Sequence, residues 1–132
     1  MDNYNRGAEC YNHQQYEMAL EEFTQAIQKG YQSSEVYNSR GYVYFLQRRY
    51  DEALADFTAS ISANLNNLRA YANRAMVYSH LQRFNEALTD ADRAVELAPN
   101  FASHYSDRGA IYFKLHYEDE ALVQLGGNNT GA

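Results

Sequence analysis

Four histidines are the side chains of this sequence best suited to acid–base or metal chemistry. Two histidines hold a metal on one helical face when they stand four residues apart, as in the motif H-E-x-x-H. The histidines here form no such pair: His13, His80, His104 and His116. There is also no glycine-rich phosphate loop, because Gly126-Gly127 follows the last apolar segment and opens no helix. The sequence therefore predicts no metal site and no cofactor.

Cys10 is the one cysteine, and a lone thiol supplies neither a disulfide framework nor a zinc site. A nucleophilic cysteine needs a nearby base, and His13 stands about one helical turn further on. However, tyrosines occupy the positions 34, 68 and 102 residues later, at Tyr44, Tyr78 and Tyr112. This recurrence favours a small core residue at Cys10, and we expect that the protein is not an enzyme.

The composition excludes several classes of partner. The chain has 11 basic and 17 acidic side chains and a net charge of −6, so it lacks the positive surface that binds nucleic acid. No segment approaches the roughly 18 consecutive apolar residues of a membrane-spanning helix. The polar start lacks the basic and apolar regions of a secretory signal. We expect a cytoplasmic protein with no nucleic-acid or membrane partner.

A 34-residue repeat organises the chain. Small residues recur in two series, which are Gly7, Gly41, Ala75 and Gly109, and then Ala19, Ala53, Ala87 and Ala121. Small residues at two fixed points let two antiparallel helices approach closely, while aromatic residues fill the space beside the contact. Each copy is therefore predicted to be a helical hairpin. A hairpin that recurs in this way buries its apolar face by stacking on its neighbours.

The helix ends follow from capping residues. Ser33 or Ser34 and Asn66 or Asn67 are good N-caps, and Pro99 stands where a helix should have stopped. We expect first helices near 3–13, 35–47, 68–81 and 102–115, and second helices near 16–29, 50–63 and 84–97. In the fourth copy we expect a shortened second helix from about Glu118 to Leu125, ended by Gly126-Gly127.

This order of aromatic, small and proline positions resembles the tetratricopeptide repeat family. The matching residues are Tyr37, Gly41, Tyr44, Ala53 and Phe57 in the second copy, and Tyr71, Ala75, Tyr78, Ala87, Ala94 and Pro99 in the third. The resemblance implies an all-α fold, a right-handed superhelical solenoid of stacked antiparallel helix–turn–helix repeats. It implies a single domain over residues 1–132, with repeats at about 1–33, 34–67 and 68–101, a partial fourth at 102–125 and a tail at 126–132.

An arginine also recurs with the repeat, at Arg6, Arg40, Arg74 and Arg108. Acidic residues share its period on the second helices at Glu22, Asp56 and Asp90, with Gln124 in the fourth place. One interpretation is a ladder of ion pairs that fixes the register of the repeats. The other is a row of guanidinium groups that grips a carboxylate or phosphate ligand. The shared period of the acids favours the ladder.

The resemblance implies that first helices line a concave groove that binds other proteins. The predicted groove residues are Asn38, Tyr42, Phe45, Arg69, Asn73, Met76, His80, Phe113 and Lys114. Aromatic residues form interaction hot spots, and amides bond a peptide backbone. For Phe45 and Phe113, packing between adjacent first helices is an equal alternative. The sequence thus predicts an adaptor or scaffold that binds a protein or peptide.

Some proteins of the resembled family hold the acidic tails of heat-shock chaperones with a clamp of Lys, Asn and Arg side chains. Counted from the first copy, the clamp positions hold Tyr4, Ala8, Ser39, Arg69 and Asn73. Counted from the second copy, they hold Asn38, Tyr42, Asn73, Ser103 and Asp107. One matching asparagine is too little to fix a carboxylate, so the sequence does not favour a chaperone tail.

Self-assembly is the alternative function. Leu122, Val123 and Leu125 are predicted to form an apolar edge together with Phe113 and Tyr117. Soluble monomers rarely leave such a patch bare. A two-fold homodimer through this C-terminal end would cover the patch.

Overall fold

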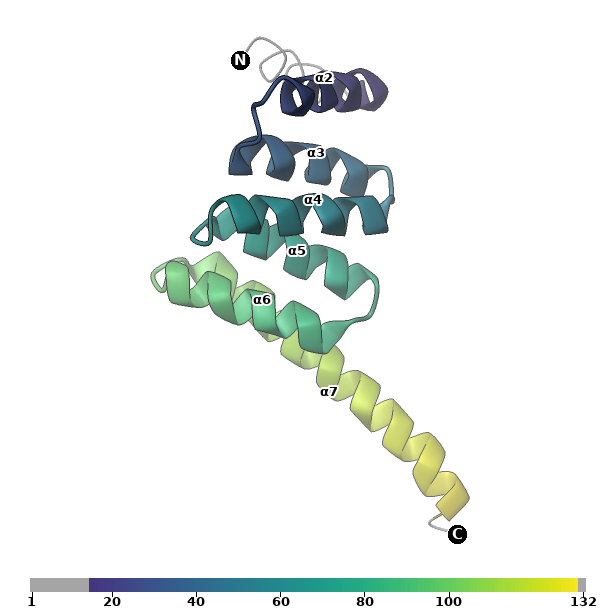
Figure 1. Cartoon of the computed structure of the whole chain (residues 1–132). Helices are drawn as coiled ribbons and strands as arrows, with labels where there is room; N and C mark the ends of the chain where they lie inside the picture. Colours follow the sequence, from purple (N-terminus) through teal and green to yellow (C-terminus); the bar gives the residue numbers. More distant parts are fainter. Residues whose placement is uncertain (1–14, 131–132) are drawn as a thin grey trace.

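The described part of the chain is a stack of antiparallel helical hairpins that continues into one long helix (Figure 1). The computed structural model describes the backbone of residues 15–130 and the side chains of residues 15–120. Its helices are α2 (Tyr16–Gln28), α3 (Ser34–Leu46), α4 (Tyr50–Ala63), α5 (Leu68–His80), α6 (Phe84–Leu97) and α7 (Ala102–Thr130). Between residues 15 and 130 there is no β-strand. This arrangement confirms the all-α repeat solenoid; the helix expected near 3–13, with Arg6, Cys10 and His13, lies outside the described residues.

The helices from α2 to α6 begin and end within one residue of the predicted bounds. The Ser33 hydroxyl caps α3 by accepting a hydrogen bond from the Val36 amide at 3.3 Å. The Asn67 side chain caps α5 in the same way, with the Ala70 amide also at 3.3 Å. These side chains satisfy amides that have no partner within the helix. The two predicted N-cap regions are therefore confirmed.

The predicted ladder of ion pairs is also present, and it joins repeats as well as helices. Arg40 donates from Nε and Nη2 to Asp56, both at 2.8 Å, and from Nη1 to Thr24 of the preceding hairpin at 3.1 Å. Arg74 repeats the pattern with Asp90 and Thr58. The hydrogen bonds with Asp56 raise the pKa of the Arg40 guanidinium above its ordinary value. The interpretation as a ladder is confirmed for these two arginines.

The turns of the second and third hairpins share an unusual backbone. Arg48 and Gln82 have positive φ angles of 61° and 60°, which are strained for residues with a side chain. The next residue, Arg49 or Arg83, lies over a tyrosine of the first helix, 4.7 Å from the Tyr44 ring or 4.8 Å from the Tyr78 ring. The same arginine bonds a glutamate three residues later, Glu52 or Glu86. These contacts hold the chain in the turn.

The fourth copy differs from the prediction. The expected turn after residue 115 and the second helix from Glu118 to Leu125 are wrong, because α7 is one continuous helix of 29 residues. It also passes through Gly126-Gly127, which do not end it. In Figure 1 the second half of α7 extends away from the stacked hairpins. The predicted edge residues Leu122, Val123 and Leu125 lie on this half, beyond residue 120, where side chains are not described.

Candidate functional site

A cavity of about 300 Å³ lies between α5 and the first half of α7. Its apolar lining includes Met76 on α5, Ala91 on α6 and Ile111 on α7. In the first two repeats the position of Ala91 is occupied by Phe23 and Phe57, whose rings are 1% and 0% exposed. A methyl group at Ala91 fills much less space than a phenyl ring, so the third repeat leaves room that earlier repeats fill.

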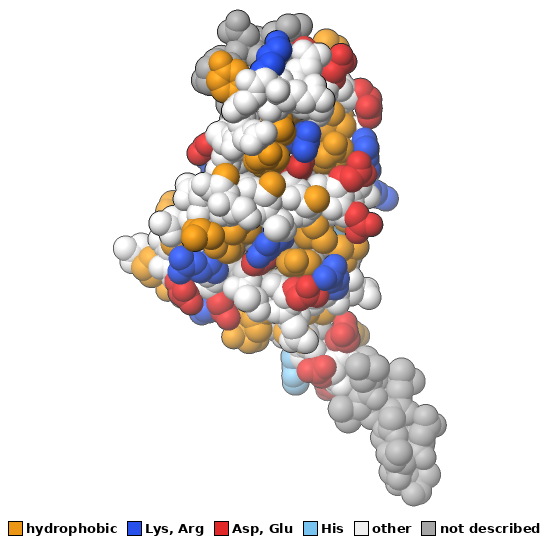
Figure 2. All heavy atoms as spheres, viewed as in Figure 1, with side chains coloured by type: hydrophobic (Ala, Val, Ile, Leu, Met, Phe, Trp, Pro, Cys, Tyr) orange, Lys and Arg blue, Asp and Glu red, His pale blue; other side chains and the backbone are white. Residues whose placement is uncertain are grey.

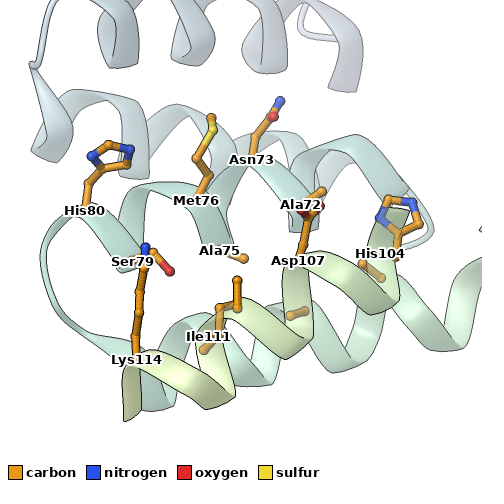
Figure 3. A pocket seen from close by; sticks show the side chains of 13 residues that line it. Ala72, Asn73, Ala75, Met76, Ser79, His80, His104, Asp107, Ile111 and Lys114 are labelled. Atoms are coloured by element: carbon orange, nitrogen blue, oxygen red, sulfur yellow. The ribbon is translucent and has the colours of Figure 1, made fainter. Parts of the chain in front are cut away.

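Polar side chains stand around this apolar floor (Figure 3). Asn73 and His80 lie along α5 with Met76, and Asp107 and Lys114 belong to α7 across from it. Asp107 and Lys114 stand seven residues apart, which corresponds to about 10 Å along a helix. Within residues 15–120 neither of these two charges has an ion-pair partner. The cavity therefore offers an apolar centre with an unpaired acid and an unpaired base about two helical turns apart.

Next to the cavity, a network of side chains continues the surface from α5 toward α3. The Asn73 amide donates a hydrogen bond to the Asn38 side-chain oxygen at 3.0 Å. The ring of His80 lies 5.1 Å from Phe45 and 5.9 Å from Tyr50, centre to centre. Tyr42 stacks on Phe45 at 6.1 Å. The predicted residues of α3 and α5, except Arg69, thus lie on one connected surface.

A second, more open hollow extends this surface toward the C-terminal half of α7. It is lined by His80, Phe84, Phe113, Lys114 and Tyr117, among others. Phe113 is 69% exposed and Tyr117 is 67% exposed. Phe113 is therefore not packed between first helices, whereas Phe45 is in contact with neighbouring rings, as its alternative interpretation predicted.

The structure brings most predicted groove residues together, with one exception. Arg69 is exposed, lines neither hollow and makes none of the contacts that join the other residues. The sequence interpretation missed His104, Ala91, Ala94 and Ile111, which line the cavity. The change from phenylalanine to alanine at position 91 was the signal that could have located the cavity, because a lost ring in a repeated core position leaves space.

Charge is mixed over the face shown in Figure 2, where acidic and basic side chains are interspersed. Arg108 differs from Arg40 and Arg74, because the fourth place of the acidic series is Gln124; Arg108 bonds Asp92 of α6 through Nη1 at 3.2 Å. In the described residues no group of His, Cys, Asp or Glu side chains is placed to hold a metal ion. None of the helices described is long and apolar enough to span a membrane.

Comparison with protein-family models identifies the class of fold. Two tetratricopeptide repeat models match the chain, one over residues 4–67 and the other over residues 68–101. Together they cover most of the sequence, so the chain belongs to the tetratricopeptide repeat family, whose fold is a protein-interaction fold. A comparison with curated proteins gives no match.

Solved structures agree with this assignment. The first repeat domain of Spaghetti (RPAP3), bound to the HSP90 peptide SRMEEVD, has a TM-score of 0.83 at 22% identity, over 86% of this chain and 90% of that one. The second repeat domain of human RPAP3, in complex with the HSP70 peptide SGPTIEEVD, has a TM-score of 0.78 at 24% identity, over 83% and 92%. The TPR2B domain of yeast Sti1, in a complex with pHsp70, scores 0.78 at 21% identity, over 89% and 95%. At these identities the likeness establishes the fold.

Proposed function

We propose that this protein is a peptide-binding module that receives an extended segment of a partner protein in its concave groove. The observation that carries the proposal is the cavity between α5 and α7, with Met76 and Ile111 in its lining. A cavity of about 300 Å³ is large enough for one apolar side chain. The amides of Asn38 and Asn73 lie on the adjoining surface, where a peptide backbone can accept and donate hydrogen bonds.

The charges around the cavity define the peptide further. Asp107 attracts a basic side chain and Lys114 attracts an acidic one, and they stand about 10 Å apart along α7. An extended peptide advances about 3.3 Å per residue, so this distance spans roughly three residues. The expected ligand is an apolar residue with a basic and an acidic residue on either side of it.

This ligand differs from the chaperone peptides bound in two of the similar structures, both of which end in EEVD. The clamp positions of this chain include Ser39 and Asp107, which cannot neutralise two carboxylates. Asn73 matches a clamp asparagine, but one asparagine is too little to fix a terminal carboxylate. An internal peptide segment with an apolar anchor fits the groove better than an acidic C-terminus.

A peptide array followed by fluorescence polarisation tests the proposal. The array should select peptides with an apolar residue between opposite charges, and Met76→Glu should weaken their binding by about 2 kcal/mol, or roughly thirtyfold. Met18→Glu is the matched control, because Met18 is 50% exposed on α2 and lies away from the groove. Equal binding by both variants would place the peptide elsewhere, and selection of EEVD peptides alone would overturn the proposed ligand.

Self-association through α7 is a second candidate function. The exposed rings of Phe113 and Tyr117 stack at 6.3 Å and form an apolar surface at the middle of this helix. A homodimer that covers them is the expectation, and sedimentation equilibrium measures it directly. The cytoplasm remains the compartment that we propose for either function.

A further inference from the structure

One face of the first half of α7 carries residue types that contact a second helix in the earlier repeats. Among residues 15–130 no second helix packs on this face. A Cβ atom added to Gly41 would lie 2.8 Å from the Phe57 ring of α4, so that glycine permits a close helix contact. Gly109 occupies the same position of the repeat, and an added Cβ atom there would have nothing within 4 Å. Tyr44 is half-buried beside its hairpin core, whereas Tyr112, its equivalent, is 51% exposed.

Arg108 on the same face has unused hydrogen-bond donors. Arg40 directs Nε and Nη2 to Asp56 on the second helix of its hairpin. Arg108 bonds Asp92 of the preceding hairpin through Nη1, and its Nε and Nη2 have no partner among residues 15–120. The fourth place of the acidic series is Gln124, whose side-chain oxygen can accept such a bond.

Residues 118–125 have the sequence pattern of a second helix. They belong to the continuous helix α7, so they do not pack against the first half of that helix. Residues 118–125 read EDEALVQL, against YDEALADF at 50–57 and FNEALTDA at 84–91. Leu125 therefore corresponds to Phe57, the residue that contacts Gly41. Because α7 is continuous, Gly109 and Leu125 of one chain are separated by 16 residues, or about 24 Å along the helix.

The straight form of α7 has a local cause. The turn residues Arg49 and Arg83, which hold a tyrosine ring and a glutamate, correspond to Tyr117, which has no guanidinium to lie over a ring and pair with a carboxylate. Tyr50 and Phe84, which begin the second helices, correspond to Glu118. His116 and Glu120 approach to 3.5 Å across one turn of the continuous helix. The contacts that hold the strained turn elsewhere are thus replaced by residues that suit an unbroken helix.

We propose that two copies of this chain exchange residues 117–130, so that this segment of each copy packs on the Gly109 face of the other. Gly41 and Phe57 stand at equal distances from Arg49 in the sequence, and Tyr117 is the residue two repeats after Arg49. Two antiparallel α7 helices that cross at Tyr117 therefore bring Gly109 of each copy to Leu125 of the other. The pair is self-complementary, as a two-fold dimer requires.

The exchange rests on the second candidate function, which is self-association through α7. It specifies which residues of the two chains are in contact. It completes the fourth hairpin of both copies, gives Gln124 of one chain to Arg108 of the other, and covers Tyr112. A closed monomer, in which residues 117–130 fold back on their own chain, would make the same contacts within one molecule. The experiment must therefore distinguish contacts between chains from contacts within a chain.

Disulfide cross-linking makes this distinction. In a Cys10→Ser background, one chain carries Gly109→Cys and a second, size-tagged chain carries Leu125→Cys. The exchange predicts a disulfide between the two chains after mixing and mild oxidation, since the paired positions should come within disulfide range. Leu65→Cys, at a 64% exposed site remote from α7, is the control that should not couple to Gly109→Cys. A chain with both substitutions that closes only on itself, or no product at all, would overturn the exchange.

A second measurement does not depend on cysteine chemistry. Gly109→Leu meets open space in the single chain, and leucine favours a helix more than glycine does, so helicity and the thermal midpoint measured below micromolar concentration should not fall. The same substitution blocks the close helix contact of the exchange, so sedimentation equilibrium should show the mass of two chains for the wild type and of one chain for the variant. If Gly109→Leu remains a dimer and Gly109→Cys forms no cross-link with Leu125→Cys, the chain self-associates by another contact and the exchange is contradicted.

Discussion

Ser34 and Ser60 join α3 to α4 by exchanging hydrogen bonds. Each hydroxyl donates to the main-chain carbonyl oxygen of the other residue at 2.7 Å. The Asn67 amide, at the start of α5, donates to the Ser34 hydroxyl at 2.6 Å. Ser60 is fully buried, and the repeats before and after it carry Ala26 and Ala94 at its position. One polar position in an otherwise apolar series thus links three helices.

Ser60→Ala should destabilise the fold by about 1–2 kcal/mol. The substitution removes a buried donor and leaves the Ser34 carbonyl without its side-chain partner. Urea unfolding followed by circular dichroism measures the effect. Ser62→Ala, on the exposed side of the same helix, is the control that should leave the midpoint unchanged. Equal midpoints for both variants would show that the exchange of hydrogen bonds adds no stability.

Asp90→Ala should destabilise by about 3 kcal/mol, because it leaves the guanidinium of Arg74 without its buried partner. The side chain of Asp90 is 4% exposed and that of Arg74 is 19% exposed. Glu86→Ala removes a pair whose side chains are 47% and 49% exposed, so its effect should be much smaller. Thermal unfolding of the two variants in low and moderate salt makes the comparison. A larger loss for Glu86→Ala would contradict this ranking.

Gly41→Leu should destabilise the protein by about 1–3 kcal/mol. The new side chain would overlap the ring of Phe57, which is fully buried and cannot move aside. Gly109→Leu makes the same change at the same repeat position without this neighbour. Chemical unfolding at concentrations where the chain is monomeric should therefore separate the two variants. If Gly41→Leu and Gly109→Leu lose similar stability, the loss in Gly41→Leu does not come from the α3–α4 contact.

Arg83→Gln should raise the pKa of Glu86. Hydrogen bonds from Arg83 lower this pKa below its ordinary value of 4.5. Since the folded pKa lies below the unfolded one, the pair stabilises the fold above about pH 4.5, and this contribution is lost as the pH falls through the lower folded pKa. A carboxyl NMR titration measures the shift, and Glu52, whose pKa is lowered by Arg49, is the internal reference. If Glu86 titrates at the same pH in Arg83→Gln as in the wild type, its lowered pKa does not come from Arg83.

The sequence predicted the hairpins because local and periodic signals agree there. The capping residues Ser33 and Asn67 mark helix starts, and small residues such as Gly41 recur at a fixed spacing. The fourth copy misled the same reasoning, because the motif EDEAL suggests a new helix start although nothing before it makes a turn. Whether a turn forms depends on contacts such as that of Arg83 with Tyr78, which a count of small and apolar residues does not include.

The candidate site was predicted less completely than the fold. The amides and aromatic rings of α3 and α5 were predicted from the family resemblance, and they lie on one surface. The cavity depends instead on the volume lost at Ala91, where two earlier repeats have phenylalanine. Sequence spacing alone does not show whether neighbouring side chains move to fill such a space. The structure shows that Met76 and Ile111 line it and leave it open.

The bonds of Arg74 have a consequence for the way the protein unfolds. This side chain bonds Asp90 in its own hairpin and Thr58 in the preceding one, and Arg40 does the same with Asp56 and Thr24. Melting of one hairpin therefore removes hydrogen bonds from the next, and the cost of partial unfolding is shared across the boundary. Strong coupling between neighbours suppresses half-melted intermediates. Amide protons from α3 to α6 should thus exchange with solvent in a single cooperative opening rather than repeat by repeat.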